Sequence, residues 1–209
     1  MINFIFGDLI LSTQLITKAK AIFLILITSL ILSIDSSDAR AEQGSCLFEG
    51  WKPKKFSHSN SKLSVVPLQF KELNGSEKNI FPRKNSGLVL NFWATWCAPC
   101  VEEMPGLEIL HQALIETDIA VFVVSIDRGK AKNIQKLISK FFKKNNLEKL
   151  KSLWDEGSRT MKALKVRGVP TTIFINAKGH EVGRIEGISD YSTKQMENFV
   201  KKCLSSATE

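Results

Sequence analysis

Two cysteines, Cys97 and Cys100, are the residues best suited to chemistry, and only two residues separate them. They stand in the stretch NFWATWCAPCVEEMP, directly after an apolar run. Such a pair could form part of a metal site, a structural disulfide or a pair that exchanges electrons. A zinc site usually needs two close ligand pairs, and this chain has only one close pair. The histidines are scattered singly, so the sequence favours redox chemistry and predicts no metal site.

The position of Cys97 predicts which cysteine reacts first. A buried strand is expected to end just before Cys97, and a helix is expected to begin there. Free N–H groups and the dipole at a helix N-terminus stabilise an anion, so the pKa of Cys97 should fall below the value of about 8.5 for a free cysteine. Cys97 is therefore the expected nucleophile, and Cys100 is its expected resolving partner.

Two neighbours of the pair are candidates for supporting roles. Glu103 follows Cys100 by one helical turn, where its carboxylate could accept the proton of the resolving thiol. Trp96 directly precedes Cys97, which it could shield while it offers a flat surface to a partner chain. The alternative for Glu103 is an ordinary exposed glutamate, and the alternative for Trp96 is a core aromatic residue. For Trp93 we expect the core position.

A second motif, VRGVPTTIFI, places Pro170 directly before an expected strand. A proline that enters a strand through a tight turn is a candidate for a cis peptide bond. If this bond were cis and beside the sulfur atoms, the backbone of Val169 could pair with a substrate backbone as an added strand. We therefore expect Pro170 in the site and Val169 in contact with substrate.

Hydrophobic periodicity predicts the elements that must position these residues. Apolar runs and turn signals predict strands or hairpins at 63–78, 87–95, 118–127, 150–157 and 171–186. Spacings of three and four residues predict helices at 97–114, 134–142, 158–166 and 190–204. This order predicts an α/β fold in which helices flank one central mixed β-sheet.

The N-terminal residues have the features of an export segment. Residues 21–34 are uncharged and apolar, two lysines precede them, and residues 39–41 fit a signal-cleavage site. Such a stretch rises about 21 Å as a helix, less than a hydrocarbon core of roughly 30 Å, yet an uncleaved anchor remains an equal alternative. The predicted organisation is a signal peptide or membrane anchor at 1–41, a polar lead-in at 42–62 and a folded domain at 63–209.

The net charge of +8 lies outside the N-terminal segment, whose own charges cancel. Many lysines stand between Lys130 and Lys151, where they alternate with the apolar residues of an expected helix. We interpret them as its solvated face. No nucleic-acid motif or aromatic interleaving accompanies them, so no nucleic-acid partner is predicted. Contact with acidic lipid headgroups fits the charge better.

Together, the two motifs resemble those of thioredoxin-like proteins of the bacterial periplasm, above all the TlpA/ResA-type disulfide reductases. The resemblance covers about residues 63–204 and implies a thioredoxin fold. It implies that Cys97 attacks, that Cys100 resolves and that Pro170 is the family's cis-proline. Glu103 matches the carboxylate that follows the cysteine pair in this group.

Two positions depart from cytoplasmic thioredoxins. A buried aspartate on the strand that leads to the motif is replaced by Asn91, so its role as proton acceptor must be absent or must pass to Glu103. The dipeptide between the cysteines is Ala98-Pro99 in place of Gly-Pro. The family's reduction potentials therefore do not carry over.

The resemblance implies an exported enzyme that reduces disulfides of substrate proteins and that a membrane electron donor keeps reduced. It would need no cofactor beyond the redox-active Cys97–Cys100 disulfide. The implied setting is cytochrome c maturation or cytochrome oxidase assembly. The enzyme would work in the periplasm of a Gram-negative-type bacterium, either soluble after signal cleavage or anchored to the inner membrane. Two alternatives stay open, a disulfide-forming oxidase and a copper-binding chaperone.

The other two cysteines, Cys46 and Cys203, lie outside the motif. Thiols outside the cytosol tend to pair, and Cys203 lies on the apolar face of the last expected helix. We hypothesise a structural disulfide between them. The alternative is two unrelated cysteines, with Cys203 an ordinary core residue.

Overall fold

Two strands that are buried along their whole length form the centre of the fold. They are β4 (Leu88–Trp93) and β7 (Thr171–Ile175), and their residues are mostly apolar, as expected for strands covered on both faces. They pair antiparallel, with Asn91 opposite Thr172 and Phe92 opposite Thr171. On its other side β4 pairs parallel with β5 (Ala120–Ser125).

The central strands belong to one mixed sheet. The computed structural model describes residues 46, 50–59, 65, 67–81 and 87–205, whose eight-stranded sheet has the order β1-β8-β7-β4-β5-β6-β2-β3. The outer strands are β1 (Phe56–His58), β2 (Leu68–Lys71), β3 (Glu77–Ile80), β6 (Lys151–Trp154) and β8 (Glu181–Glu186). The β4–β5 and β5–β6 pairs are parallel, and every other pair in this sheet is antiparallel.

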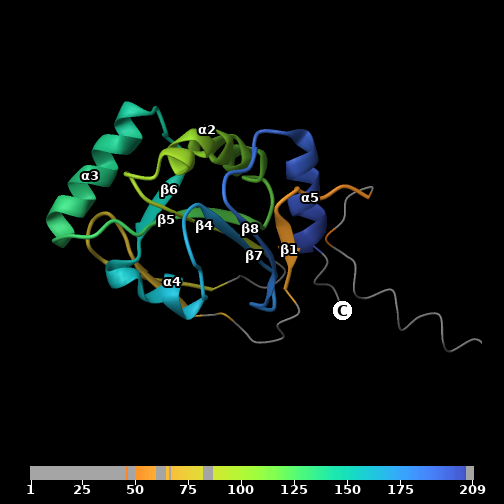
Figure 1. Ribbon diagram of the computed structural model, residues 1–209, viewed down its shortest axis with the longest axis horizontal. Helices are drawn as coiled ribbons and strands as arrows, with labels where there is room; N and C mark the ends of the chain where they lie inside the picture. Colours follow the sequence, from red (N-terminus) through yellow and green to blue (C-terminus); the bar gives the residue numbers. More distant parts are fainter. Residues whose placement is uncertain (1–45, 47–49, 60–64, 66, 82–86, 206–209) are drawn as a thin grey trace, which may run out of the picture. The chain divides into compact units, whose positions relative to one another are not determined.

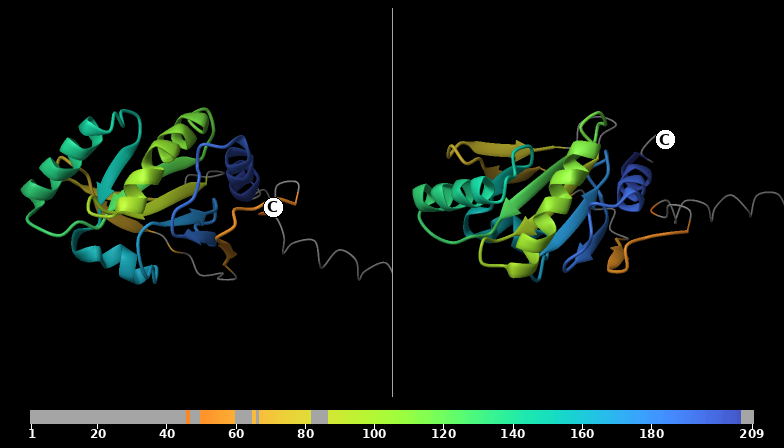
Figure 2. Two further views of the ribbon diagram at one scale, coloured as in Figure 1. Left: turned by 45° about the horizontal axis from the view of Figure 1, so that its top comes forward. Right: turned by 90° about the horizontal axis from the view of Figure 1, so that it is seen from above.

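Helices cover both faces of the sheet, with α2, α3 and α5 on one face and α4 on the other (Figures 1 and 2). Their bounds are α2 (Ala98–Ala113), α3 (Ala131–Lys144), α4 (Arg159–Ala163) and α5 (Lys194–Ser205). Alternate residues of a strand share a face, so Asn91 and Trp93 of β4 point the same way. Asn91 bonds to Glu103 of α2, and the ring centroid of Trp93 lies 4.8 Å from that of Phe141 of α3. The predicted α/β fold with helices around a central mixed sheet is confirmed.

The lysine-rich helix α3 contacts the rest of the domain through a narrow stripe. Ile134, Ile138 and Phe142 are buried, and they follow one another at intervals of four residues. The lysines of this helix are exposed, as predicted for a solvated face. Leu137 was expected on the apolar face, but it is 42% exposed because it lies beside this stripe.

The sheet begins earlier than the predicted domain boundary at residue 63. Strand β1 lies within the predicted polar lead-in at 42–62, yet it pairs antiparallel with β8. Phe56 is its one buried residue, and Gly183 of β8 lies so close to its ring that a Cβ atom there would clash. A single buried residue among polar neighbours leaves no alternation in the sequence, so the pattern could not reveal this edge strand.

The predicted signal or anchor segment at 1–41 lies outside the described residues. Among the residues that the structure describes, no helix is long and apolar enough to cross a membrane.

A disulfide joins Cys46 to Cys203 near the end of α5, and both cysteines are buried. The two residues are 157 positions apart in the sequence, so the bond closes almost the whole domain into one loop. Closing a loop of this length restricts the unfolded chain, which is worth roughly 4 to 5 kcal/mol in the chain-entropy account.

Replacing both residues, Cys46→Ala with Cys203→Ala, should therefore lower the free energy of unfolding by roughly 4 to 5 kcal/mol. Urea denaturation of the oxidised proteins measures the change. The matched control is Cys97→Ala with Cys100→Ala, which removes a disulfide between residues only 3 positions apart and should cost less. Equal losses in the two double variants would contradict the loop-closure argument.

Candidate active site

The cysteine pair lies where the central strand gives way to a helix. Cys97 and Cys100 form a disulfide, with Cys97 as the N-cap of α2 and Cys100 in its first turn. The backbone N–H of Cys100 donates to Sγ of Cys97 at 3.3 Å. This N–H group and the dipole of the helix can stabilise a thiolate on Cys97 once the disulfide is reduced.

The surface beside the pair is formed by Trp96. Its side chain is 68% exposed, whereas Cys97 is only 5% exposed and Cys100 is fully buried. An exposed tryptophan next to a reactive residue is an unusual use of a large apolar side chain, and it can offer a flat contact to a partner. Trp93 lies in the core, as predicted.

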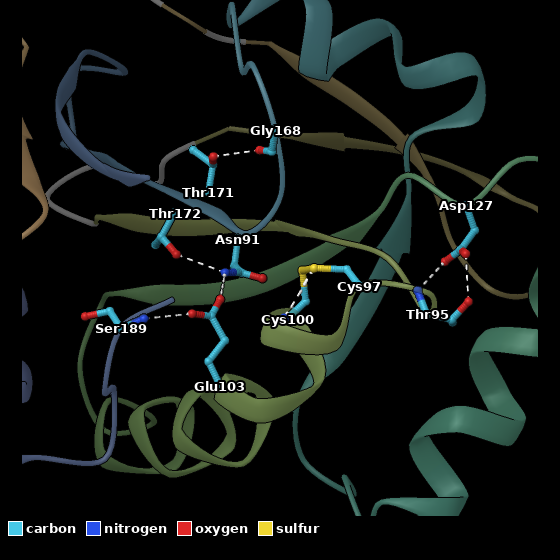
Figure 3. The surroundings of a disulfide bond; sticks show 10 residues. All are labelled: Asn91, Thr95, Cys97, Cys100, Glu103, Asp127, Gly168, Thr171, Thr172 and Ser189. Atoms are coloured by element: carbon cyan, nitrogen blue, oxygen red, sulfur yellow. Dashed lines mark hydrogen bonds between the residues drawn. A yellow bond between two sulfur atoms is a disulfide. The ribbon is translucent and has the colours of Figure 1, made fainter. Parts of the chain in front are cut away.

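The loop that carries Trp96 and Cys97 is fixed by a buried carboxylate, Asp127, which follows β5. Asp127 accepts hydrogen bonds from the backbone N–H of Thr95 at 3.0 Å and from its hydroxyl at 2.7 Å (Figure 3). The hydroxyl of Ser125 donates to the same carboxylate. No motif in the sequence marks Asp127. Its place after a buried strand is a usable signal, because the carboxyl ends of neighbouring parallel strands share one sheet edge.

The predicted proline lies at the same end of the sheet. The Val169–Pro170 peptide bond is cis. Because Thr171 pairs with Phe92, the residues just before β7 lie beside the end of β4, from which the chain leads to the cysteines. The Thr171 hydroxyl donates to the carbonyl of Gly168 at 2.8 Å and fixes this loop, while Pro170 is buried and Val169 is half-buried (Figure 3).

Glu103 lies inside the protein rather than on its surface. It is 4% exposed, and its two carboxylate oxygens accept hydrogen bonds from Asn91 Nδ2 at 2.8 Å and from the backbone N–H of Ser189 at 3.0 Å. Burial raises the pKa of Glu103 to about 7, and these two hydrogen bonds with the charge of Lys55 only partly offset that effect. A carboxylate with this pKa can gain or lose a proton at neutral pH.

Behind Glu103 lies a polar network that the sequence did not reveal. The second hydrogen of Asn91 Nδ2 goes to the hydroxyl of Thr172 at 2.9 Å, and that hydroxyl lies 2.6 Å from the hydroxyl of Tyr191. Burial raises the pKa of Tyr191, which therefore stays an uncharged phenol. The sequence marks Asn91 only as the replacement of an aspartate, because its partners lie on elements far apart in the chain.

A cleft of about 560 Å³ opens beside this network. Glu102, Glu103 and Ile109 of α2 line one side, and Ser189 and Tyr191 line the other. The residue that carries the buried carboxylate thus lines a cleft. Within the described ranges of the chain, no cluster of three or more histidine, cysteine or acidic side chains could hold a metal ion.

The predicted residues therefore fall into two places. Cys97, Cys100 and Glu103 lie along the first turns of α2, with Trp96 beside them and the Pro170 loop at the same end of the sheet. Cys46 and Cys203 lie elsewhere, at the far end of α5.

Comparisons with known proteins agree with this geometry. The AhpC/TSA family matches residues 65–181. The thiol-disulfide oxidoreductase ResA of Bacillus thuringiensis subsp. konkukian is 28% identical over 131 residues, which cover 63% of this chain and 71% of ResA.

Solved structures show the same fold. StoA from Bacillus subtilis superimposes with a TM-score of 0.53 at 24% identity, covering 65% of this chain and 98% of StoA. A secreted thiol-disulfide isomerase from Corynebacterium glutamicum has a TM-score of 0.56 at 20% identity, covering 69% of this chain and 90% of the isomerase. The chain therefore belongs to the AhpC/TSA family and is a thioredoxin-fold thiol–disulfide oxidoreductase similar to ResA.

Proposed function

We propose that the protein is an exported reductase of protein disulfides, with Cys97 as the attacking thiol and Cys100 as the resolving thiol. The observation that carries the proposal is the cysteine pair at the N-terminus of α2, with Glu103 buried one turn later at a pKa of about 7. A nucleophile at a helix end, a resolving thiol and a nearby proton acceptor are the groups that such chemistry needs.

Reduction of a substrate proceeds in two exchanges. The Cys97 thiolate attacks a substrate disulfide, a mixed disulfide forms, and one substrate sulfur leaves as a thiolate that takes a proton. Cys100 then loses its proton and attacks the sulfur of Cys97. The second substrate sulfur leaves with the electron pair of the broken bond. The substrate has gained two electrons, the protein ends as the Cys97–Cys100 disulfide, and a membrane electron donor of dithiol type reduces it again.

Glu103 is the proposed acceptor of the Cys100 proton. Its pKa of about 7 is closer to neutral pH than that of an exposed glutamate, which makes proton transfer in both directions feasible. The cleft that it lines offers a route for exchange of this proton with solvent. Burial is the main reason for the raised pKa, so the packing that shields the carboxylate from water also gives it a pKa suited to this proton transfer.

Substrate contact is assigned to Trp96 and to the backbone of Val169. Trp96 is exposed beside the sulfur atoms, and Val169 precedes the cis-proline at the same sheet end. The proposed substrates are proteins whose cysteines must be reduced for cytochrome c maturation or cytochrome oxidase assembly, a setting that the resemblance to TlpA/ResA-type proteins implies. The proposed place is the periplasm, with attachment through residues 1–41 or release by signal cleavage. The name of the secreted Corynebacterium glutamicum isomerase supports an extracytoplasmic site.

Replacing Cys100 with serine should trap substrates on Cys97, because the mixed disulfide can no longer resolve. We expect covalent adducts that a dithiol reductant releases, and mass spectrometry of the released proteins identifies the substrates. The matched control is Cys97→Ser with Cys100→Ser, which should capture none of them. Adducts of equal amount in the control, or none in Cys100→Ser, would argue against Cys97 as the attacking thiol.

Replacing Glu103 with glutamine should slow the resolving step and remove its pH dependence near 7. With Glu103 present, the rate should rise as pH passes through its pKa, because the ionised carboxylate can accept the proton. At pH 8 we expect a loss of roughly 100-fold or more, and at pH 5.5 the two proteins should differ little. Stopped-flow tryptophan fluorescence of mixed-disulfide resolution follows the step.

Neighbouring Glu102 supplies the control for that substitution. It stands on the same turn but is exposed, so Glu102→Gln should leave both the rate and its pH profile unchanged. If Glu103→Gln kept the rise near pH 7, Glu103 would not be the proton acceptor.

The direction of electron flow depends on the reduction potential of the Cys97–Cys100 pair. As a reductase the pair should lie nearer to thioredoxin, at about −270 mV, than to the strong oxidant DsbA, at about −120 mV. Equilibration with glutathione buffers of defined ratio measures the potential. A value near that of DsbA would support the disulfide-forming oxidase in place of the reductase.

A further inference from the structure

One polar atom beside the active site has no partner among the residues that the structure describes. The side-chain oxygen of Asn91 is buried, since Asn91 is fully enclosed in the core, and it accepts no hydrogen bond from any described residue of the oxidised protein. A buried acceptor without a partner costs roughly 1 to 3 kcal/mol, and such atoms are rare in folded proteins. This oxygen therefore needs a physical explanation.

The orientation of the Asn91 amide is set by its nitrogen. Nδ2 has two hydrogens, and both are used, one toward Glu103 at 2.8 Å and one toward the Thr172 hydroxyl at 2.9 Å. Turning the amide over would place its oxygen against the carboxylate oxygen of Glu103. The oxygen must therefore face the opposite side, and Figure 3 shows it pointing toward the Cys97–Cys100 disulfide.

The residue on that side is a buried sulfur that changes its bonding during turnover. In the oxidised protein Cys100 is bonded to Cys97 and has no hydrogen to donate. When the disulfide is reduced, Cys100 becomes a thiol in a position that is fully shielded from water. A buried S–H group is a weak donor that still benefits from an acceptor.

We propose that the side-chain oxygen of Asn91 accepts a hydrogen bond from the Cys100 thiol in the reduced protein. The inference rests on the proposed function, because it concerns the thiol that this function assigns to resolution. It makes Asn91 a positioning residue, whose nitrogen holds the carboxylate of Glu103 while its oxygen holds the S–H group of Cys100. The amide of Asn91 then positions both the thiol that gives up the proton and the carboxylate that accepts it.

The resolving step balances with this arrangement. An amide oxygen holds a proton donor in place but is too weak a base to take its proton. The hydrogen bond from Cys100 to the amide oxygen and the S–H bond break, the proton goes to the carboxylate of Glu103, and the sulfur forms a bond to Cys97. The bond between Cys97 and the substrate sulfur breaks, and that sulfur leaves with the electron pair.

The hydrogen bond also links Asn91 to the redox equilibrium of the pair. The acceptor is satisfied in the reduced protein and unsatisfied in the oxidised protein, so Asn91 favours the reduced form. A hydrogen bond of ordinary strength corresponds to a factor of about 3 to 10 in the equilibrium between dithiol and disulfide. A weak S–H donor should lie toward the lower end of that range.

The S–H stretching band in the infrared reports this bond directly. The protein to use is Cys97→Ala with the Cys46–Cys203 disulfide intact, because Cys100 is then its one thiol. We expect the band at the lower frequency of a hydrogen-bonded thiol. Adding Asn91→Leu, which has a similar volume and no acceptor, should move the band to the frequency of an unbonded thiol.

Thr172→Val is the matched control, because it loosens the same network on the other side of the amide. It removes a partner of the Asn91 nitrogen and leaves the oxygen free to accept, so the band should stay at the lower frequency. A band that moves equally in Thr172→Val and Asn91→Leu would show a merely structural role for Asn91. Asn91→Asp, which keeps both volume and acceptor, should keep the lower frequency.

The dithiol–disulfide equilibrium supplies a second readout in the protein that retains both active-site cysteines. Asn91→Leu should shift the equilibrium with glutathione toward the disulfide by about 3- to 10-fold, and Thr172→Val should leave it unchanged. A Cys100 band at the unbonded frequency in the Cys97→Ala protein would overturn the inference, whatever the variants show. That result would leave substrate trapping by Cys100→Ser unaffected, so the inference and the proposed function fail separately.

Discussion

The hydrogen bond between Asn91 and Glu103 joins the central strand to the helix that carries both cysteines. It is 2.8 Å long and lies in the interior, where polar groups must be paired and where the geometry of a pair is fixed by packing. Because α2 rests on β4 at this point, the first turn of the helix has a defined position over the sheet. The position of Cys100 and the pKa of Glu103 both depend on this contact.

Burial at this contact disfavours the ionised form of Glu103, and the proposed function makes use of this effect. A carboxylate in the core is disfavoured in its ionised form, yet two hydrogen bonds and the charge of Lys55 stabilise that form. The balance leaves Glu103 able to change protonation state at neutral pH. A fully exposed glutamate would remain ionised, and one without hydrogen bonds would hold its proton more firmly. The two hydrogen bonds to Glu103 are therefore part of the chemistry as well as of the packing.

Other buried contacts hold the two loops that face a substrate. Asp127 fixes Thr95 just before Trp96 and Cys97, and the Thr171 hydroxyl fixes the turn that contains the cis-proline. Loops held in this way can present reactive groups with little reorganisation when a partner binds. The disulfide between Cys46 and Cys203 acts at a distance from both loops, where it stabilises the domain that supports them.

The sequence by itself determined the order of helices and strands, the α/β class and the reactive pair, because periodicity and the Cys-x-x-Cys spacing are local signals. It also placed Glu103 on the face of Cys100. It missed β1, whose pairing depends on one buried phenylalanine, and it set the domain boundary too late. Tertiary structure alone decided the burial of Glu103, its link through Asn91 to Thr172 and Tyr191, and the role of Asp127. Those contacts join residues up to 86 positions apart, and a pKa set by burial exists only once the helix is packed on the sheet.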